Sequence, residues 1–119
     1  MHEQLDRIGA RVEAAARRAG RAPSEITLIG ISKTVPAGRV GEAISAGLVD
    51  LGENRVQEAA TKIPELARML GPAADRVTWH LVGHLQSNKA RRAVELFSVI
   101  HSVDSFALAD RLSRCATDL

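Results

Sequence analysis

Apolar residues recur over residues 2–19 at the three-four spacing of an amphipathic helix. On one face of this helix lie Leu5, Ile8, Val12, Ala15, Ala16 and Ala19. Gly20 suits the end of the helix. The pattern then changes to a continuous apolar run, Ile26 to Ile31, which is rich in β-branched residues and is closed by Pro36. Such a run predicts a buried strand over about residues 25–33.

The same two patterns alternate through the rest of the chain. Further strands are predicted over about residues 48–52, 77–83 and 98–103. Each of the four strands is followed by a predicted amphipathic helix, beginning near residues 36, 54, 88 and 105. Pro64 should end or restart the helix that begins near residue 54, because a proline inside a helix costs about 3 kcal/mol.

This alternation predicts an α/β fold with parallel strands and right-handed crossovers. Two architectures fit: a small open sheet, or the first half of a (β/α)₈ barrel. A complete barrel usually needs about 250 residues, whereas this chain has 119, which predicts one domain over residues 1–119. In either architecture the first and fourth strands would be sheet edges with apolar side chains. Such edges favour self-association.

The composition narrows the function classes. Hydrophobic residues make up 45% and charged residues 25% of the chain, as is usual for a globular protein, and neither a secretory signal nor a membrane-length apolar stretch is visible. The cytoplasm is therefore the expected location. A net charge of +2 and an aromatic content of 3% argue against a nucleic-acid partner.

Cys115 is the single cysteine, which excludes an internal disulfide and a multi-cysteine zinc site. His80 and His84 straddle a strand end, so no metal site is predicted.

Lys33 is the strongest candidate for chemistry. The chain has three lysines among its sixteen basic residues, and this one ends the first predicted strand. The carboxyl ends of parallel strands are where α/β folds place their functional groups. Burial disfavours the ammonium form of a lysine and leaves a neutral amine that can attack an aldehyde. The alternative is a strand-end lysine that simply reaches solvent.

Other polar residues follow the remaining strands and should gather at the same edge. They are Glu53, Asn54, His80, His84, Gln86, Ser87, Asn88, Lys89, His101, Ser102 and Asp104. An amine among hydrogen-bonding groups suits a carbonyl-containing ligand. Structural roles are open as well, since Asn54, Ser87 and Asn88 can cap helices and His80 can be a hydrogen-bonded core histidine. Lys89 could either help the site or face water.

Four motifs resemble those of the pyridoxal-phosphate homeostasis protein family. They are Ile29 to Thr34 (IGISKT), Leu51 to Glu58 (LGENRVQE), Trp79 to Lys89 (WHLVGHLQSNK) and His101 to Asp104 (HSVD). The resemblance implies a barrel related to the N-terminal domain of alanine racemase, with Lys33 forming a Schiff base with pyridoxal 5′-phosphate. It also implies that Asn54, His80, Ser87 and Asn88 line the cofactor pocket or brace its floor.

The resemblance further implies a cofactor carrier with a role in vitamin B6 homeostasis rather than an enzyme. One alternative is a pyridoxal-phosphate enzyme of the racemase type, which would need a second acid or base that the sequence does not reveal. Family members are roughly twice as long, so this chain corresponds to their N-terminal part and lacks strands five to eight, whose loops commonly hold phosphate in barrels. A second alternative is therefore a half-barrel that no longer binds cofactor and associates with another copy.

Overall fold

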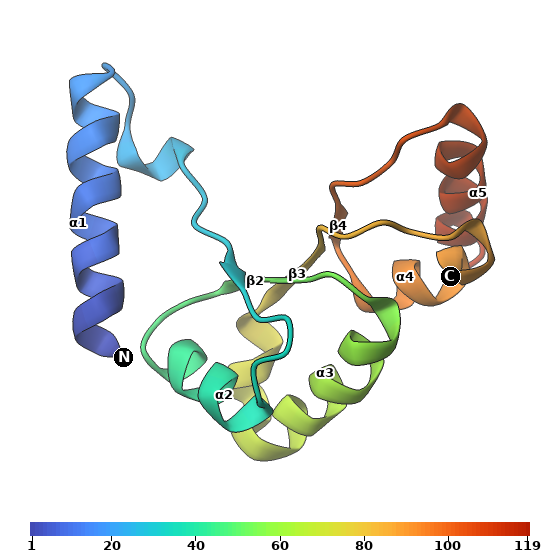
Figure 1. Cartoon of the computed structure of the whole chain (residues 1–119), viewed down its shortest axis with the longest axis horizontal. Coiled ribbons are helices and arrows are strands. Elements are labelled where there is room, and N and C mark those ends of the chain that lie inside the picture. The colour runs from blue at the N-terminus through green and yellow to red at the C-terminus, as the bar shows by residue number, and fades with distance from the viewer.

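The computed structural model describes residues 1–119 and contains one sheet of four parallel strands (Figure 1). In sheet order the strands are β1 (Gly30–Ile31), β2 (Asp50–Glu53), β3 (Thr78–Leu81) and β4 (Val99–Ile100). The helices are α1 (His2–Arg18), α2 (Ala37–Ser45), α3 (Val56–Leu70), α4 (Ala90–Leu96) and α5 (Phe106–Thr117). Short 3₁₀ turns cover Pro23–Glu25, Gly71–Arg76 and Ser87–Lys89. The predicted α/β alternation and the edge positions of the first and fourth strands are confirmed.

One face of the sheet is packed against helices. Leu51 of β2 and Leu81 of β3 point to this side, where they are almost fully buried with Leu66 of α3. The core that they share also contains Val40, Ile44, Val56, Ala59, Ala90, Ala93, Phe97, Leu108, Leu112 and Cys115. Because each of the four helices that follow a strand supplies part of this layer, the hydrophobic periodicity of these helices accounts for it.

The opposite face of the sheet, called here the open face, is covered by no element of the chain. Ile31 of β1 is 48% exposed and Val99 of β4 is 38% exposed. Gly52 of β2 also lies on this face, and a methyl group added there would meet Ile31 Cδ1 at 2.7 Å. The prediction that the first strand is buried is therefore wrong. Only the side chains that face the helices are packed, and those on the open face meet solvent.

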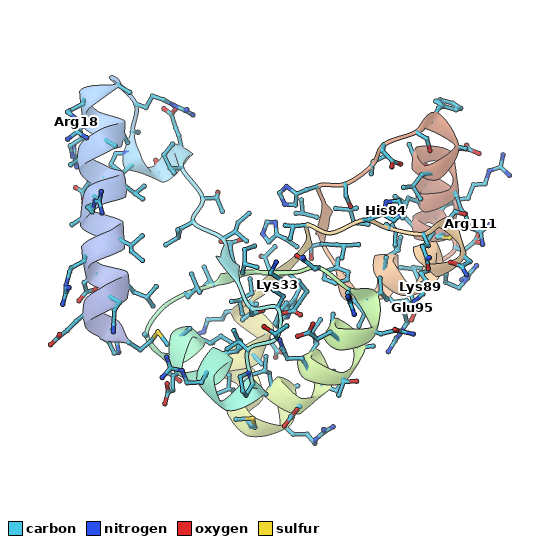
Figure 2. The ribbon with its side chains drawn as sticks, viewed as in Figure 1. Arg18, Lys33, His84, Lys89, Glu95 and Arg111 are labelled. Atoms are coloured by element: carbon cyan, nitrogen blue, oxygen red, sulfur yellow. The ribbon has the colours of Figure 1, made fainter.

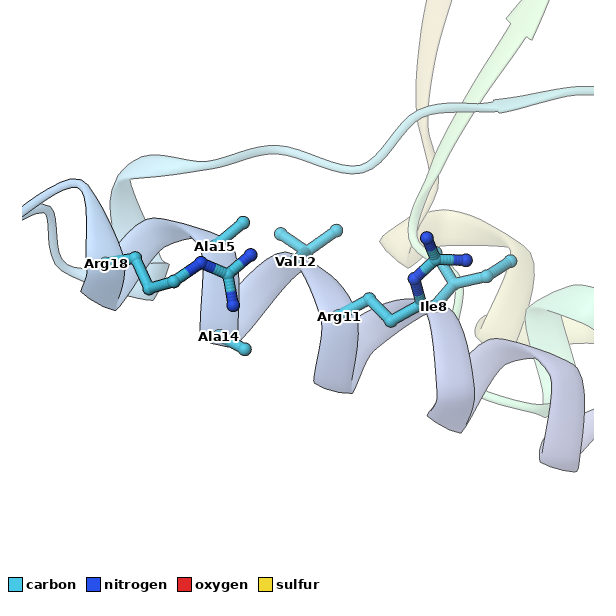
Figure 3. Close-up of a pocket in the computed structure, with 6 residues that line it drawn as sticks. All are labelled: Ile8, Arg11, Val12, Ala14, Ala15 and Arg18. Carbon is cyan, nitrogen blue, oxygen red and sulfur yellow. The ribbon is translucent and has the colours of Figure 1, made fainter.

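Helix α1 lies apart from the rest of the molecule, as Figure 1 shows. Ala16 is its one buried residue, and its apolar stripe is largely exposed, with Ile8 and Val12 lining a shallow hollow beside Arg11 and Arg18 (Figure 3). The Cα radius of gyration is 15.7 Å, whereas a compact domain of this length has about 13.5 Å. The molecule is therefore more open than a typical domain. None of its helices combines the length and the apolar character needed to span a bilayer.

Several local predictions need correction. The first and fourth strands are shorter than predicted, since each has a paired neighbour on one side only. Helix α3 continues through Pro64, whose exposed position lets water reach the carbonyl that loses its amide partner. No side-chain cap comes from Asn54, Ser87 or Asn88, whereas Ser105 caps α5 through the Leu108 amide at 3.1 Å.

Candidate functional site

Lys33 follows β1 on the same side as Ile31, at the carboxyl-terminal edge of the open face. Its side chain is exposed and makes no hydrogen bond or ion pair. Figure 2 shows it near the middle of the molecule, with His84 and Lys89 closer to α4 and α5. Of the two positions considered from the sequence, Lys33 therefore has the one that reaches solvent, because the face to which it belongs is uncovered. Its amine is sterically free to meet a ligand.

The parallel ladder continues beyond the strand ends and sets the neighbours of Lys33. The Val82 amide donates to the Glu53 carbonyl at 3.0 Å, and the His101 amide donates to the Leu81 carbonyl at 2.9 Å. On the other side the Ser32 amide donates to the Gly52 carbonyl at 2.9 Å. This register places four residues in one row across the open face: Lys33, Asn54, Val82 and His101.

A polar pocket lies between the chain segments that follow β2 and β3. It is lined by Asn54, Arg55, Val56, Gln57, His84, Leu85, Gln86 and Lys89. The two segments approach closely at Gly83, where an added Cβ would collide with the backbone of Asn54. The lining holds two fixed cations, Arg55 and Lys89, and no carboxylate, so it suits an anionic group. Ser87 and Asn88 are exposed on the following turn and do not line this pocket.

His80 belongs to a chain of three polar side chains on the open face. Its Nε2 lies 2.9 Å from Asp50 Oδ1, and its Nδ1 lies 2.9 Å from His101 Nε2. Since the Asp50 carboxylate accepts a hydrogen bond, neutral His80 carries its proton on Nε2 and accepts from His101 through Nδ1. His80 is buried and His101 is exposed. The hydrogen-bonded histidine considered from the sequence is present, and it faces the same side as Lys33.

Beneath Lys33, on the helix-packed side, lies a buried ionic network. Lys62 of α3 donates through Nζ to Glu53 Oε2 at 3.0 Å and to Glu58 Oε2 at 3.1 Å. The Ser32 hydroxyl also bonds to Glu53 Oε2. The side chain of Lys62 is 7% exposed and that of Glu53 is 0% exposed, so both charges are removed from water. Glu53 Oε1 is buried without a hydrogen-bond partner.

The same network reaches the backbone on both sides of Lys33. Lys62 Nζ donates to the Ser32 carbonyl at 2.6 Å, and the Thr34 amide donates to Glu58 Oε2 at 2.6 Å. The hydrogen bond from the Thr34 amide, followed by that from Lys62, lowers the pKa of Glu58 below its ordinary value of 4.5. Glu58 is therefore held as a carboxylate.

Lys62 and Asp50 were not among the residues singled out from the sequence. A signal for Lys62 existed, because it lies three residues after Ala59 and four before Leu66, on the buried stripe of α3. A lysine on such a stripe needs an acidic partner, and Glu58 lies one helical turn away. Asp50 had no such signal, since only strand register brings it to His80.

Curated proteins with similar sequences share one description. The chain is 45% identical over 111 residues to the pyridoxal phosphate homeostasis protein of Pseudomonas aeruginosa, covering 93% of this chain and 46% of that protein. The protein of the same description from Escherichia coli is 42% identical over 109 residues, covering 92% and 45%. The chain thus spans about half the length of the curated relatives it matches. No protein-family model matches the chain.

Solved structures agree with this resemblance. PipY of Synechococcus elongatus, solved without and with pyridoxal phosphate (PLP) bound, is 50% identical with a TM-score of 0.73, covering 90% of this chain and 47% or 48% of PipY. A protein of unknown function from Bifidobacterium adolescentis superposes with a TM-score of 0.86 at 35% identity, covering 98% and 49%. The predicted resemblance and the partial-barrel architecture are confirmed, and the half-length coverage fits the N-terminal half of these proteins.

Proposed function

Because the chain is similar to the pyridoxal phosphate homeostasis proteins over about half of their length, we propose that it binds pyridoxal 5′-phosphate through Lys33. Its role would be to hold and release this cofactor in the cytoplasm, as part of vitamin B6 homeostasis. The observation that carries the proposal is the free amine of Lys33, at the carboxyl end of β1, on the face of the sheet that no helix covers. PipY, which is 50% identical, has PLP bound in one of its structures.

The residues present fit such a ligand. The amine of Lys33 has no competing partner within the chain. The polar pocket beside Asn54 offers Arg55 and Lys89 to a phosphate group and contains no carboxylate to repel it. Asn54 would orient the ligand, and His80 would brace the open face beneath it. Ser87 and Asn88 would contact the ligand only through the turn that they form.

The chemistry requires the neutral form of the Lys33 amine. Its nitrogen lone pair attacks the aldehyde carbon, a carbon–nitrogen double bond replaces the carbon–oxygen double bond, and water leaves. No electrons enter or leave the system, so no further reactant is needed. The bond is hydrolysed by the reverse route, which suits reversible storage of an aldehyde cofactor.

An absorbance titration with pyridoxal 5′-phosphate tests this function. We expect the wild-type protein to show a saturable Schiff-base band and Lys33→Ala to show none. Borohydride reduction followed by peptide mass mapping should place the label on Lys33. Lys89→Ala is the matched control, which should keep the label on Lys33 while weakening binding. Labelling spread over Lys33, Lys62 and Lys89, or an unchanged band in Lys33→Ala, would refute the proposal.

One observation favours an enzyme as the second candidate. The hydrogen-bonded chain from Asp50 through His80 to His101 ends in an exposed imidazole on the open face, in the same row as Lys33. A racemase-type reaction needs a group that moves a proton beside the cofactor, and a histidine can do so near neutral pH. Incubation of the cofactor-loaded protein with amino acids in D₂O tests this. Exchange of the α-proton that His101→Gln abolishes would support an enzyme, whereas no exchange above free cofactor would exclude it.

Self-association is the third proposal. Apolar side chains remain exposed at the two sheet edges and on the open face, including Ile31, Val99 and Val103. Unpaired parallel edges of this kind favour pairing with another chain. Sedimentation equilibrium of the full chain tests this, and we expect a dimer or a larger species. If the protein stays monomeric at every concentration and also binds the cofactor tightly, the hypothesis of a half-barrel that exists only as an oligomer is excluded.

A further inference from the structure

We propose that Lys62 and Glu58 are positioning residues that hold the backbone on both sides of Lys33 and thereby aim its amine across the open face. The inference rests on the proposed function, because it assigns a purpose to the geometry of the proposed cofactor lysine. The two residues come from one turn of α3 and contact Ser32 and Thr34, the residues that flank Lys33. We call this set of contacts the clamp.

The clamp joins two backbone groups through one ion pair. Lys62 Nζ donates to the Ser32 carbonyl at 2.6 Å, and Glu58 Oε2 accepts from the Thr34 amide at 2.6 Å. The ion pair between them is 3.1 Å long. Since the carbonyl before Lys33 and the amide after it are both fixed, rotation of the Lys33 backbone is restricted from two sides. The long side chain then searches a smaller volume.

The backbone geometry after Lys33 shows why a clamp is needed. Thr34 has a φ of 61°, the only positive φ among the non-glycine residues of the chain. A β-branched residue in this region is strained and persists only when its surroundings hold it there. The carboxylate of Glu58 supplies that restraint at the Thr34 amide. The strained turn bends the chain away immediately after Lys33 and leaves its side chain at the edge of the sheet.

Bonds to the backbone distinguish the clamp from an ordinary ion pair that joins a helix to a sheet. Lys62 and Glu53 are withdrawn from water, and a buried ion pair often contributes little net stability because desolvation offsets the attraction. Apolar side chains at these positions would join α3 to the sheet equally well. Lys62 and Glu58 do what apolar side chains cannot, since they bond to the two peptide groups beside Lys33.

The decisive variant is Glu58→Ala, which removes the acceptor of the Thr34 amide. Glu58→Gln is the conservative variant, because its amide oxygen can still accept that hydrogen bond. Glu65→Ala is the matched control on the same helix, since Glu65 is exposed and takes part in none of these contacts. Thermal unfolding of all three variants shows whether each one folds.

Two readouts separate positioning from a merely structural role. The first is hydrogen exchange of the Thr34 amide, measured by NMR without cofactor, which should become at least about tenfold faster in Glu58→Ala and stay unchanged in Glu58→Gln and Glu65→Ala. The second is the affinity for pyridoxal 5′-phosphate, measured together with the identity of the lysine on which borohydride traps the cofactor. We expect Glu58→Ala to lose about tenfold or more in affinity and to lose selectivity for Lys33, with recovery in Glu58→Gln.

The outcomes are distinct. Faster Thr34 exchange together with unchanged affinity and trapping would overturn the proposal and leave the clamp as a structural contact. Unchanged Thr34 exchange in a folded Glu58→Ala protein would overturn it as well. If wild-type protein fails to trap the cofactor at all, the proposed function fails. Selective acetylation of Lys33 by acetic anhydride, compared between wild type and Glu58→Ala, then still tests whether the clamp orients the amine.

Discussion

The two faces of the sheet differ in how completely their side chains are withdrawn from water. On the helix-packed face Leu51 and Leu81 are buried, and the charges of Glu53 and Lys62 pair with each other out of water. On the open face the apolar side chain of Ile31 meets solvent, and Lys33 has no partner. Consecutive residues of one short segment therefore point to opposite faces: the Ser32 side chain is hydrogen-bonded on the packed face, and the Lys33 side chain is free on the open face. A reactive amine needs such a division, because its backbone must be rigid and its nitrogen accessible.

The largest effect should come from breaking the buried charge network. Lys62→Met leaves the Glu53 carboxylate buried without its cation, which we expect to lower the free energy of unfolding by about 3–5 kcal/mol in urea denaturation. The double variant Glu53→Gln/Lys62→Met removes both charges and should recover part of that loss. A loss below about 1 kcal/mol in Lys62→Met would show that the packed face does not depend on this pair.

The next test compares equivalent truncations on the two faces. Leu81→Ala deletes a side chain that is 0% exposed and should cost about 2–5 kcal/mol, since it leaves a cavity in the packed layer. Ile31→Ala deletes a side chain that is 48% exposed, and its cost should stay below about 1 kcal/mol. Chemical denaturation of the two variants measures the difference. Equal losses would mean that the open face is covered in solution, for instance by a second copy of the chain.

A smaller effect is expected where the ends of β2 and β3 approach each other. Gly83→Ala places a methyl group against the backbone of Asn54 and should cost about 1–3 kcal/mol, because the two segments have to move apart. Gly9→Ala is the control, since nothing lies within 4 Å of the added group and a helical glycine is replaced by alanine. That variant should gain about 0.5–1 kcal/mol. Thermal unfolding of both variants should therefore show shifts of opposite sign.

The smallest effect is a dependence of stability on pH that comes from Glu58. Its pKa is lower in the folded chain than its ordinary value of 4.5, because the Thr34 amide and Lys62 bond to the carboxylate. The unfolded chain thus takes up a proton more readily. The contribution of Glu58 to stability is complete above pH 4.5 and is lost as the pH falls through the lower folded-state value. We expect the difference in the free energy of unfolding between wild type and Glu58→Gln, measured from pH 7 to pH 3, to decrease below pH 4.5. A difference that stays constant over this range would contradict the role assigned to Glu58.

Much of the fold follows from the sequence alone, because hydrophobic periodicity is a local property. The alternation of strands and helices, the parallel order and the positions of the edges could all be predicted from residue spacing. The same reasoning placed Lys33 at the carboxyl end of its strand, and the four motifs pointed to the family resemblance that the relatives support. Lengths of edge strands could not be predicted in this way, since they depend on how many neighbours each strand finds.

The tertiary structure alone decided which groups meet. Lys62 reaches the Ser32 carbonyl, and Glu58 reaches the Thr34 amide, because α3 packs beneath β1 and β2. Asp50, His80 and His101 form a hydrogen-bonded chain because strand register aligns three separate strands. The exposure of Lys33 is likewise a property of the whole fold. Residue spacing predicts which side of a strand is apolar, but only the assembled chain determines whether anything covers it.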